Sequence, residues 1–165
     1  MLFLNLYEKI LSEFEDEDLL IRETELKSSA EGLYQDGVIA INKKIETNKQ
    51  KACVLAEEIG HHKKTYGNIQ KLDTIENLKQ EYKARLYAYE KLVSLNDLAF
   101  YLNKGITNIY ELADMLNITD RFLQDALLTY KNKYGDKIIN TKYGKIVFEP
   151  NIIFMPKIRL EKENE

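Results

Sequence analysis

The stretch that decides the fold of this chain contains both of its histidines and two adjacent glutamates, Leu55-Ala56-Glu57-Glu58-Ile59-Gly60-His61-His62. Apolar residues recur at helical spacing from Ala52 to Ile59, which predicts a half-buried helix. Positions four residues apart lie on one face of a helix, so Glu57 is expected over His61 and Glu58 over His62. The sequence therefore predicts a helix that carries two carboxylates and two imidazoles beside its buried stripe.

Local signals predict where this helix begins and ends. Thr47 is a typical N-cap, because its hydroxyl can accept a hydrogen bond from a backbone N–H of the first turn. The predicted end is Tyr66-Gly67-Asn68, where Gly67 can adopt the left-handed cap conformation. Gly60 is unusual inside a helix, since glycine costs about 1 kcal/mol relative to alanine there. We interpret Gly60 as a point where another group approaches the backbone closely.

The charged residues of the stretch are close to the pattern H-E-x-x-H. In that pattern two histidines four residues apart bind zinc, and the glutamate beside the first polarises a water. Here Glu57 replaces the first histidine, so the pattern becomes Glu57-Glu58-Ile59-Gly60-His61. Charged residues also gather on the solvated faces of ordinary helices, which is the alternative interpretation. The apolar stripe beside the pattern and the glycine within it favour a metal site.

A zinc site of this kind needs a third protein ligand from another element and one position open for water. Because the chain has no further histidine, this ligand has to be a carboxylate. Glu81 is the best-placed candidate, on the next long predicted helix, which includes residues 81–93. Glu76 and Glu90 are alternatives at a poorer helical phase.

Three elements are predicted before the histidine-bearing helix. Apolar residues at helical spacing from Leu2 to Phe14 predict a first helix, which an acidic run ends. Residues 19–26 are typical of an edge strand. Asp36-Gly37 between apolar residues predicts a tight hairpin, because both central positions of a type I′ turn need φ > 0. Residues 19–42 are therefore expected to form a small antiparallel sheet.

The second half is predicted to be mainly helical. A helix is expected from Ser94 to about Asn103, followed by a break at Gly105. Residues 108–134 match a helix-turn-helix pattern, with its second helix predicted at 120–134. The following segments are expected to be a two-stranded hairpin with Tyr143-Gly144 as its turn, at residues 137–149, and an extended, partly frayed tail from Pro150.

The helix-turn-helix pattern has two interpretations, a DNA reader and a structural helical hairpin. DNA binding draws most of its affinity from phosphate neutralisation by Lys and Arg. The second helix of the pattern begins with Asp120 and becomes basic only from Lys131, and the net charge of the chain is −3. We therefore favour a structural hairpin or a protein-docking face, and we expect no DNA binding.

Bulk properties indicate a soluble protein in a reducing compartment. The 165 residues suffice for one compact domain or a small domain with an appendage. Cys53 is the single cysteine, which excludes an intrachain disulfide. The start of the chain lacks the basic segment of a signal peptide, and no apolar run approaches the roughly 20 residues of a membrane span. We expect a cytoplasmic protein without a membrane partner.

Three segments carry a family resemblance. They are the hairpin Gly32-Leu33-Tyr34-Gln35-Asp36-Gly37-Val38-Ile39-Ala40-Ile41, the stretch from Leu55 to His62, and Glu81-Tyr82-Lys83-Ala84-Arg85-Leu86-Tyr87-Ala88-Tyr89-Glu90-Lys91-Leu92. Together they resemble the ImmA/IrrE family of metallopeptidases, across roughly residues 19–93. The resemblance implies an α+β fold, with a zincin-like core that has a small antiparallel sheet and a metal-binding helix. It also implies a helix-turn-helix-like extension with a short β-hairpin, so we expect two domains, at 1–93 and 94–165.

The resemblance assigns roles to individual residues. The metal helix of the family typically carries His-Glu-Leu-Gly-His, and the third-ligand helix Glu-x-x-Ala-Asn. Carried over, His61 matches the second zinc-binding histidine, Glu58 the general base and Glu81 the third ligand. Glu57 stands in place of the first histidine, which implies a metal set of Glu57, His61 and Glu81. Arg85 stands where the family has its asparagine.

This resemblance also implies a cofactor, an activity and a partner. A ligand set rich in oxygen implies zinc, or manganese or another divalent ion that prefers carboxylates. His62 is the alternative to His61, reached by a modest rotation of the helix. The implied activity is cleavage of a phage or mobile-element repressor, which relieves repression. The alternative is a non-catalytic antirepressor that binds the repressor through a degenerate metallopeptidase fold.

Overall fold

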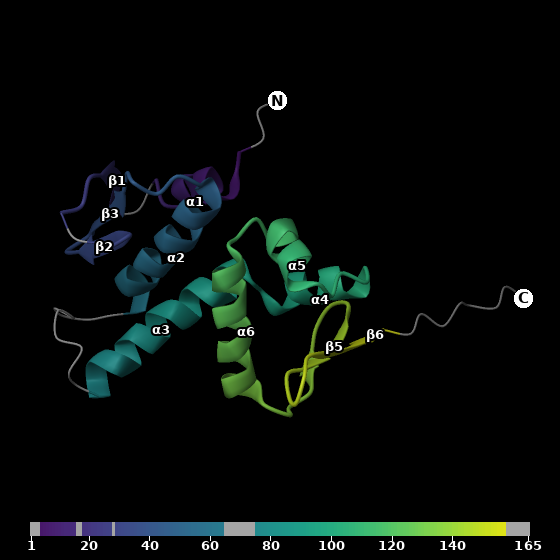
Figure 1. The fold of residues 1–165 in the computed structure, drawn as a ribbon. Coiled ribbons are helices and arrows are strands. Elements are labelled where there is room, and N and C mark those ends of the chain that lie inside the picture. Colours follow the sequence, from purple (N-terminus) through teal and green to yellow (C-terminus); the bar gives the residue numbers. More distant parts are fainter. Residues whose placement is uncertain (1–3, 16–17, 28, 65–74, 158–165) are drawn as a thin grey trace, which may run out of the picture.

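The computed structural model describes residues 4–15, 18–27, 29–64 and 75–157 (Figure 1). The helices are α1 (Leu6–Glu13), α2 (Asn48–Lys64), α3 (Ile75–Leu92), α4 (Leu95–Asn103), α5 (Ile109–Leu116) and α6 (Asp120–Tyr134). The strands are β1 (Leu20–Thr24), β2 (Gly32–Gln35), β3 (Val38–Asn42), β4 (Ile139–Asn140), β5 (Gly144–Val147) and β6 (Ile153–Pro156). The predicted α+β fold class is confirmed.

The first sheet is mixed, so the prediction that it is antiparallel was wrong. Its strand order is β1-β3-β2. β2 and β3 form the predicted antiparallel hairpin, with positive φ at Asp36 and Gly37. β3 takes the centre because four of its residues are buried, whereas β1 and β2 remain largely open to water. β1 and β2 lie on opposite sides of β3, and β1 pairs with β3 in parallel.

Helix α2 is the central element of the first half. It contacts α1, α3 and the hairpin strands, and Figure 1 shows it between the small sheet and α3. Thr47 caps it as predicted, because Thr47 Oγ1 accepts a hydrogen bond from the backbone N–H of Gln50 at 3.2 Å. Its buried stripe is the predicted one, with Ala52, Leu55 and Ile59 fully buried. The predicted end at Tyr66-Gly67-Asn68 lies outside the described residues.

The helices predicted for the second half are confirmed, and each begins at a side-chain cap. The side chains of Ser94, Asn108 and Thr119 each accept hydrogen bonds from the first turn of the helix that follows. Helix α6 spans the predicted residues 120–134, and Gly105 interrupts the chain between α4 and α5 with a φ of 83°.

The second sheet is larger than the predicted hairpin. β4 and β5 form that hairpin, and β6 adds a third antiparallel strand on the other side of β5. The segment after Pro150, which was expected to be a partly frayed tail, supplies this strand. Gly144 was expected in a turn but begins β5, where a Cβ would lie 2.3 Å from the carbonyl oxygen of Met155. A glycine is needed there because β6 lies directly against the backbone.

One hydrophobic core connects the two halves of the chain. It contains buried residues from α1, α2 and α3 together with residues from α4, α5, α6 and β5. Tyr130 of α6 is fully buried, and its hydroxyl donates a hydrogen bond to the Val93 carbonyl at 2.8 Å. This contact spans the predicted division between residues 93 and 94, which remains a prediction. In the described part of the chain, no helix is both long and apolar enough to cross a membrane.

Candidate functional site

The site is built where α2 and α3 touch at their backbones. A Cβ added at Gly60 would lie only 2.2 Å from the carbonyl oxygen of Ala84. No side chain fits between two helices at that distance, so the helices meet at Gly60. The residues that follow these two contact points in the chain are His61 and Arg85. The close approach therefore places the histidine of α2 beside the charged residues of α3.

His61 and Glu81 are brought together by this packing. The Nε2 atom of His61 lies 3.4 Å from Oε2 of Glu81, and both side chains are mostly buried. The alternative carboxylates lie elsewhere: Glu76 is exposed at the start of α3, and Glu90 pairs with Lys133 of α6 at 2.6 Å. Of the three carboxylates considered for the third ligand, Glu81 is the one that meets His61.

Arg85 is the residue of this site that the sequence reasoning missed. Its Nε atom lies 2.8 Å from Oε1 of Glu81, so the two oxygens of Glu81 face a guanidinium and an imidazole. Glu81 and Arg85 are four residues apart on α3, and that spacing favours an ion pair. The i, i+4 spacing was the available signal, and Arg85 was noted only as a departure from the family pattern.

Glu57 is partly buried, and this burial raises the pKa of its carboxyl to about 7. The positive charge of Arg85 lowers this pKa, whereas the negative charge of Glu81 raises it further. Glu57 lies one turn before His61 on α2, and a pKa of about 7 means that its carboxyl is about half protonated at neutral pH.

Glu58 points toward the first sheet. A Cβ added at Gly32 of β2 would lie 2.6 Å from Oε1 of Glu58, so the carboxyl packs against the backbone of this edge strand. Burial raises the pKa of Glu58 to about 7, and the negative charges of Glu57 and Glu81 add to the rise. A backbone hydrogen bond from Tyr34 opposes it. A carboxyl with such a pKa can both take and return a proton at neutral pH.

The two histidines face different partners. His62 Nδ1 lies 3.1 Å from the hydroxyl of Tyr34, and the two rings meet edge to face. His61 lies against Glu81 on α3 instead. Of the two histidines, His61 is therefore the one that shares a site with the predicted carboxylate ligand, and His62 fixes α2 to strand β2.

The raised pKa values of Glu57 and Glu58 predict that the protein loses stability as pH rises. A folded-state pKa above the unfolded value means that the folded state binds the proton more tightly. The stabilisation is therefore complete below about pH 4.5 and disappears as pH passes 7. We expect Glu58→Gln, measured with chelator by urea unfolding, to be more stable than the unmodified protein at pH 8 by about 2 kcal/mol.

The same pair of proteins should differ much less at pH 5, because most of the Glu58 side chains are protonated there. Glu76→Gln is the matched control, since Glu76 is exposed on α3 and should change stability little at either pH. A Glu58→Gln protein that is less stable than the unmodified one at pH 8 would contradict the burial argument.

The donor set can be compared with the needs of a divalent ion. Glu57, His61 and Glu81 provide the two carboxylates and one imidazole that such an ion accepts as ligands. These three side chains do not surround a common point in the structure. Among the described residues, no three His, Cys, Asp or Glu side chains form a group that could hold an ion. The chemistry of the donors fits a metal ion, whereas the guanidinium on Glu81 opposes one.

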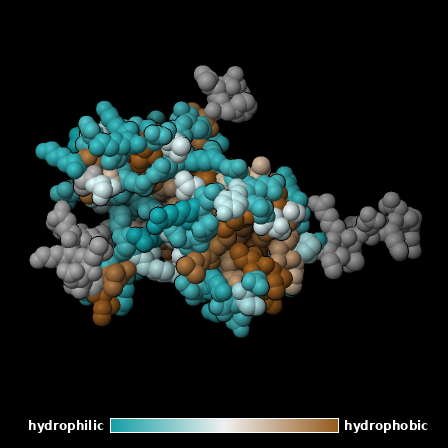
Figure 2. All heavy atoms as spheres, viewed as in Figure 1, coloured by the Kyte–Doolittle hydropathy of each residue, from teal (hydrophilic) through white to brown (hydrophobic). Residues whose placement is uncertain are grey.

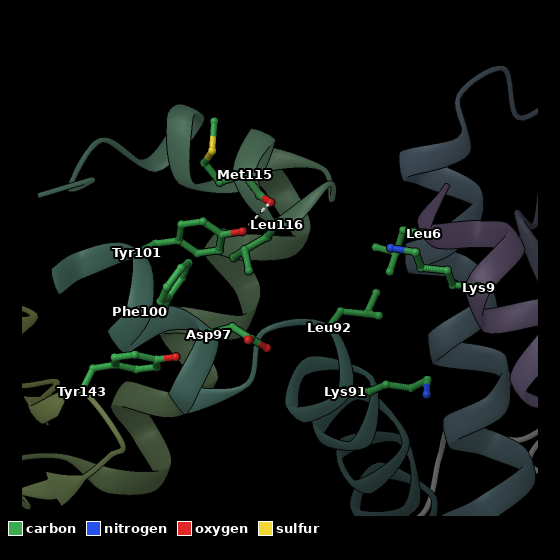
Figure 3. A pocket seen from close by; sticks show the side chains of 10 residues that line it. All are labelled: Leu6, Lys9, Lys91, Leu92, Asp97, Phe100, Tyr101, Met115, Leu116 and Tyr143. Carbon is green, nitrogen blue, oxygen red and sulfur yellow. Dashed lines mark hydrogen bonds between the residues drawn. The ribbon is translucent and has the colours of Figure 1, made fainter. Parts of the chain in front are cut away.

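The molecule also has a cleft, which lies away from these candidate ligands. This open cleft of about 450 Å³ lies between α1 and the end of α3 on one side and α4 and α5 on the other, and Figure 3 shows the side chains that line it. Seven of its ten lining residues are apolar or aromatic, and the charged ones are Lys9, Lys91 and Asp97, whose carboxylate accepts a hydrogen bond from Ser94 Oγ. Hydrophobic side chains also gather nearby, over α4 and the second sheet (Figure 2). This composition suits contact with a protein better than acid–base chemistry.

One of the comparisons with known proteins found a match, and it supports the family and the α+β fold. The family model described as IrrE N-terminal-like domain matches residues 14–134, which include α2, α3 and all the candidate site residues. No curated protein matches the chain, and no solved structure does. The match covers well over half of the chain and extends through α6. The chain therefore belongs to the IrrE N-terminal-like family of metallopeptidases.

Proposed function

We propose that the chain is a metal-dependent endopeptidase that cleaves a repressor protein of a phage or mobile element, in the cytoplasm. The observation that supports this most is the contact between His61 of α2 and Glu81 of α3. It joins a predicted ligand of one helix to the predicted ligand of the next. Glu58 lies one residue from Glu57 and packs against edge strand β2.

Each residue has a defined role in this proposal. Glu57, His61 and Glu81 would hold zinc or manganese, which supplies a polarised water when bound. Glu58 would serve as the general base and acid, taking a proton from a water at its carboxylate and returning it to the leaving amine. A pKa of about 7 suits both steps. β2 is the outer strand of its sheet, and the free side of an edge strand can pair with an extended peptide.

The test is incubation of the purified protein, with zinc or manganese, with candidate repressor proteins of phages and mobile elements. We expect a defined fragment with the unmodified protein and at least a 100-fold slower reaction with Glu58→Gln, because general-base catalysis contributes about that much or more. Glu76→Gln is the control that should cleave normally, because that carboxylate is exposed on α3. If the Glu58→Gln protein cleaves as fast as the unmodified one, or if neither cleaves, the peptidase assignment is wrong.

A second candidate function is a non-catalytic antirepressor. The observation that favours it is the ion pair between Arg85 and Glu81, because a carboxylate bound to a guanidinium is less available to a metal ion. In this case the protein would bind the repressor without cutting it, and the aromatic cleft beside α4 is a suitable docking surface. Elemental analysis of protein purified without chelators separates the two functions. Bound metal that is lost in His61→Ala supports the peptidase, and a stable complex with intact repressor and no metal supports the antirepressor.

A further inference from the structure

Arg85 already supplies a positive charge where a metal ion would bind. Its guanidinium contacts Oε1 of Glu81 at 2.8 Å, while the other oxygen of Glu81 faces His61. A cation would need at least one of these oxygens. The contact between Gly60 and Ala84 places Arg85 beside α2, so its position follows from the way the helices pack.

Exposure distinguishes Arg85 from the residues that it contacts. The side chain of Arg85 is 54% exposed, whereas Glu81 is 22% and His61 17% exposed. The guanidinium can therefore swing into water without disturbing the core, and the carboxylate and imidazole cannot. The Arg85 guanidinium can therefore leave the candidate metal site by a rotation of its own side chain.

We propose that Arg85 competes with the metal ion for Glu81, and that its guanidinium has to move into solvent before an ion is bound. This inference rests on the proposed metal site. A divalent ion and a guanidinium on the same carboxylate repel each other, because like charges at short range in a partly buried site are poorly screened. Arg85 therefore weakens metal binding and keeps the site closed at low metal concentration.

The test is a direct titration of zinc, and separately of manganese, into the full-length protein, followed by competition with a chromophoric chelator. We expect Arg85→Gln to bind the ion about 10- to 100-fold more tightly than the unmodified protein, the range found when groups around metal ligands are changed. Arg85→Lys should bind close to the unmodified protein, because it keeps the charge. Glu81→Gln in the Arg85→Gln background should lose the gain.

Arg121→Gln is the matched control, because Arg121 also lies four residues from an acidic partner, Asp125, but is 93% exposed on α6. Circular dichroism verifies that each variant is folded, and Arg85→Met replaces Arg85→Gln if the latter is not. Equal or weaker metal binding by the neutral variant, or no binding by either protein, would overturn the proposal. Tighter binding without repressor cleavage by any variant would leave this inference standing and refute the peptidase function.

Discussion

Gly60→Ala is expected to destabilise the protein by about 3 kcal/mol, although the same change in an ordinary helix stabilises by about 1 kcal/mol. The physical reason is the position of the new methyl group, 2.2 Å from the carbonyl oxygen of Ala84. The obstacle is backbone, which cannot move aside as a flexible side chain can. Helices α2 and α3 would have to separate, and the contact between His61 and Glu81 would be lost with them.

Urea unfolding followed by circular dichroism measures this effect. The matched control is Lys83→Gly on the exposed face of α3, which should cost about 1 kcal/mol and shows the size of the propensity effect in this protein. Because propensity and packing predict opposite signs at Gly60, an alanine variant as stable as the unmodified protein would disprove the close helix contact. Metal binding by the same variant should also be impaired, because Glu81 moves away from His61.

Gly60 illustrates what the sequence could predict about the site. A glycine in a strongly periodic helix indicated a close approach before any partner was known, and the partner proved to be α3. The same kind of local signal correctly placed the Thr47 cap and the Asp36-Gly37 turn. Each of these features depends on a few neighbouring residues, which is why the sequence alone was sufficient.

The errors concern contacts between distant segments. The parallel pairing of β1 with β3 depends on which strand is buried most, and β1 alone does not reveal that β3 takes the centre of the sheet. To predict β6 from the sequence, one would have to know that β5 has an edge open for pairing. No local pattern after Pro150 indicates this. Turn and capping signals do not include such pairings, so the sequence reasoning described an antiparallel sheet and a loose tail.

The candidate site was also only partly predictable from the sequence, because it depends on contacts between distant segments. The sequence placed Glu57, His61 and Glu81 in one hypothesis, and the structure brings His61 and Glu81 into contact. The influence of Arg85 could not be predicted with the same certainty, because an i, i+4 pair on a helix surface is usually solvated and weak. Its importance arises only because α2 covers part of the pair, and that packing is a tertiary feature.

Tyr130→Ala is expected to have the other large effect on stability, a loss of about 4 kcal/mol. The ring of Tyr130 is fully buried, and it packs against Tyr134 and Phe148. Its hydroxyl donates a hydrogen bond to the Val93 carbonyl, which lies at the end of α3. The side chain therefore connects the second half of the chain to the helix that carries Glu81.

Tyr130→Phe separates the hydrogen bond from the ring. It removes only the hydroxyl and leaves the Val93 carbonyl without this donor, so we expect a loss of about 1 to 2 kcal/mol. Tyr110→Phe is the control, because the Tyr110 side chain is 59% exposed and its hydroxyl can bind water in either state. Urea unfolding monitored by both far-UV circular dichroism and tyrosine fluorescence gives the free energies.

The shape of these transitions also tests the predicted division into residues 1–93 and 94–165. A shared core predicts that the Tyr130→Ala protein unfolds in one transition, shifted to lower urea, with both signals coincident. Two separated transitions would indicate that the halves are independently stable domains that meet at Tyr130. In that case the variant would weaken the second half alone, and metal binding at Glu81 would survive the first transition. A single shifted transition would instead make α6 part of the support for the site, because the helix that carries Glu81 ends at the residues that Tyr130 holds.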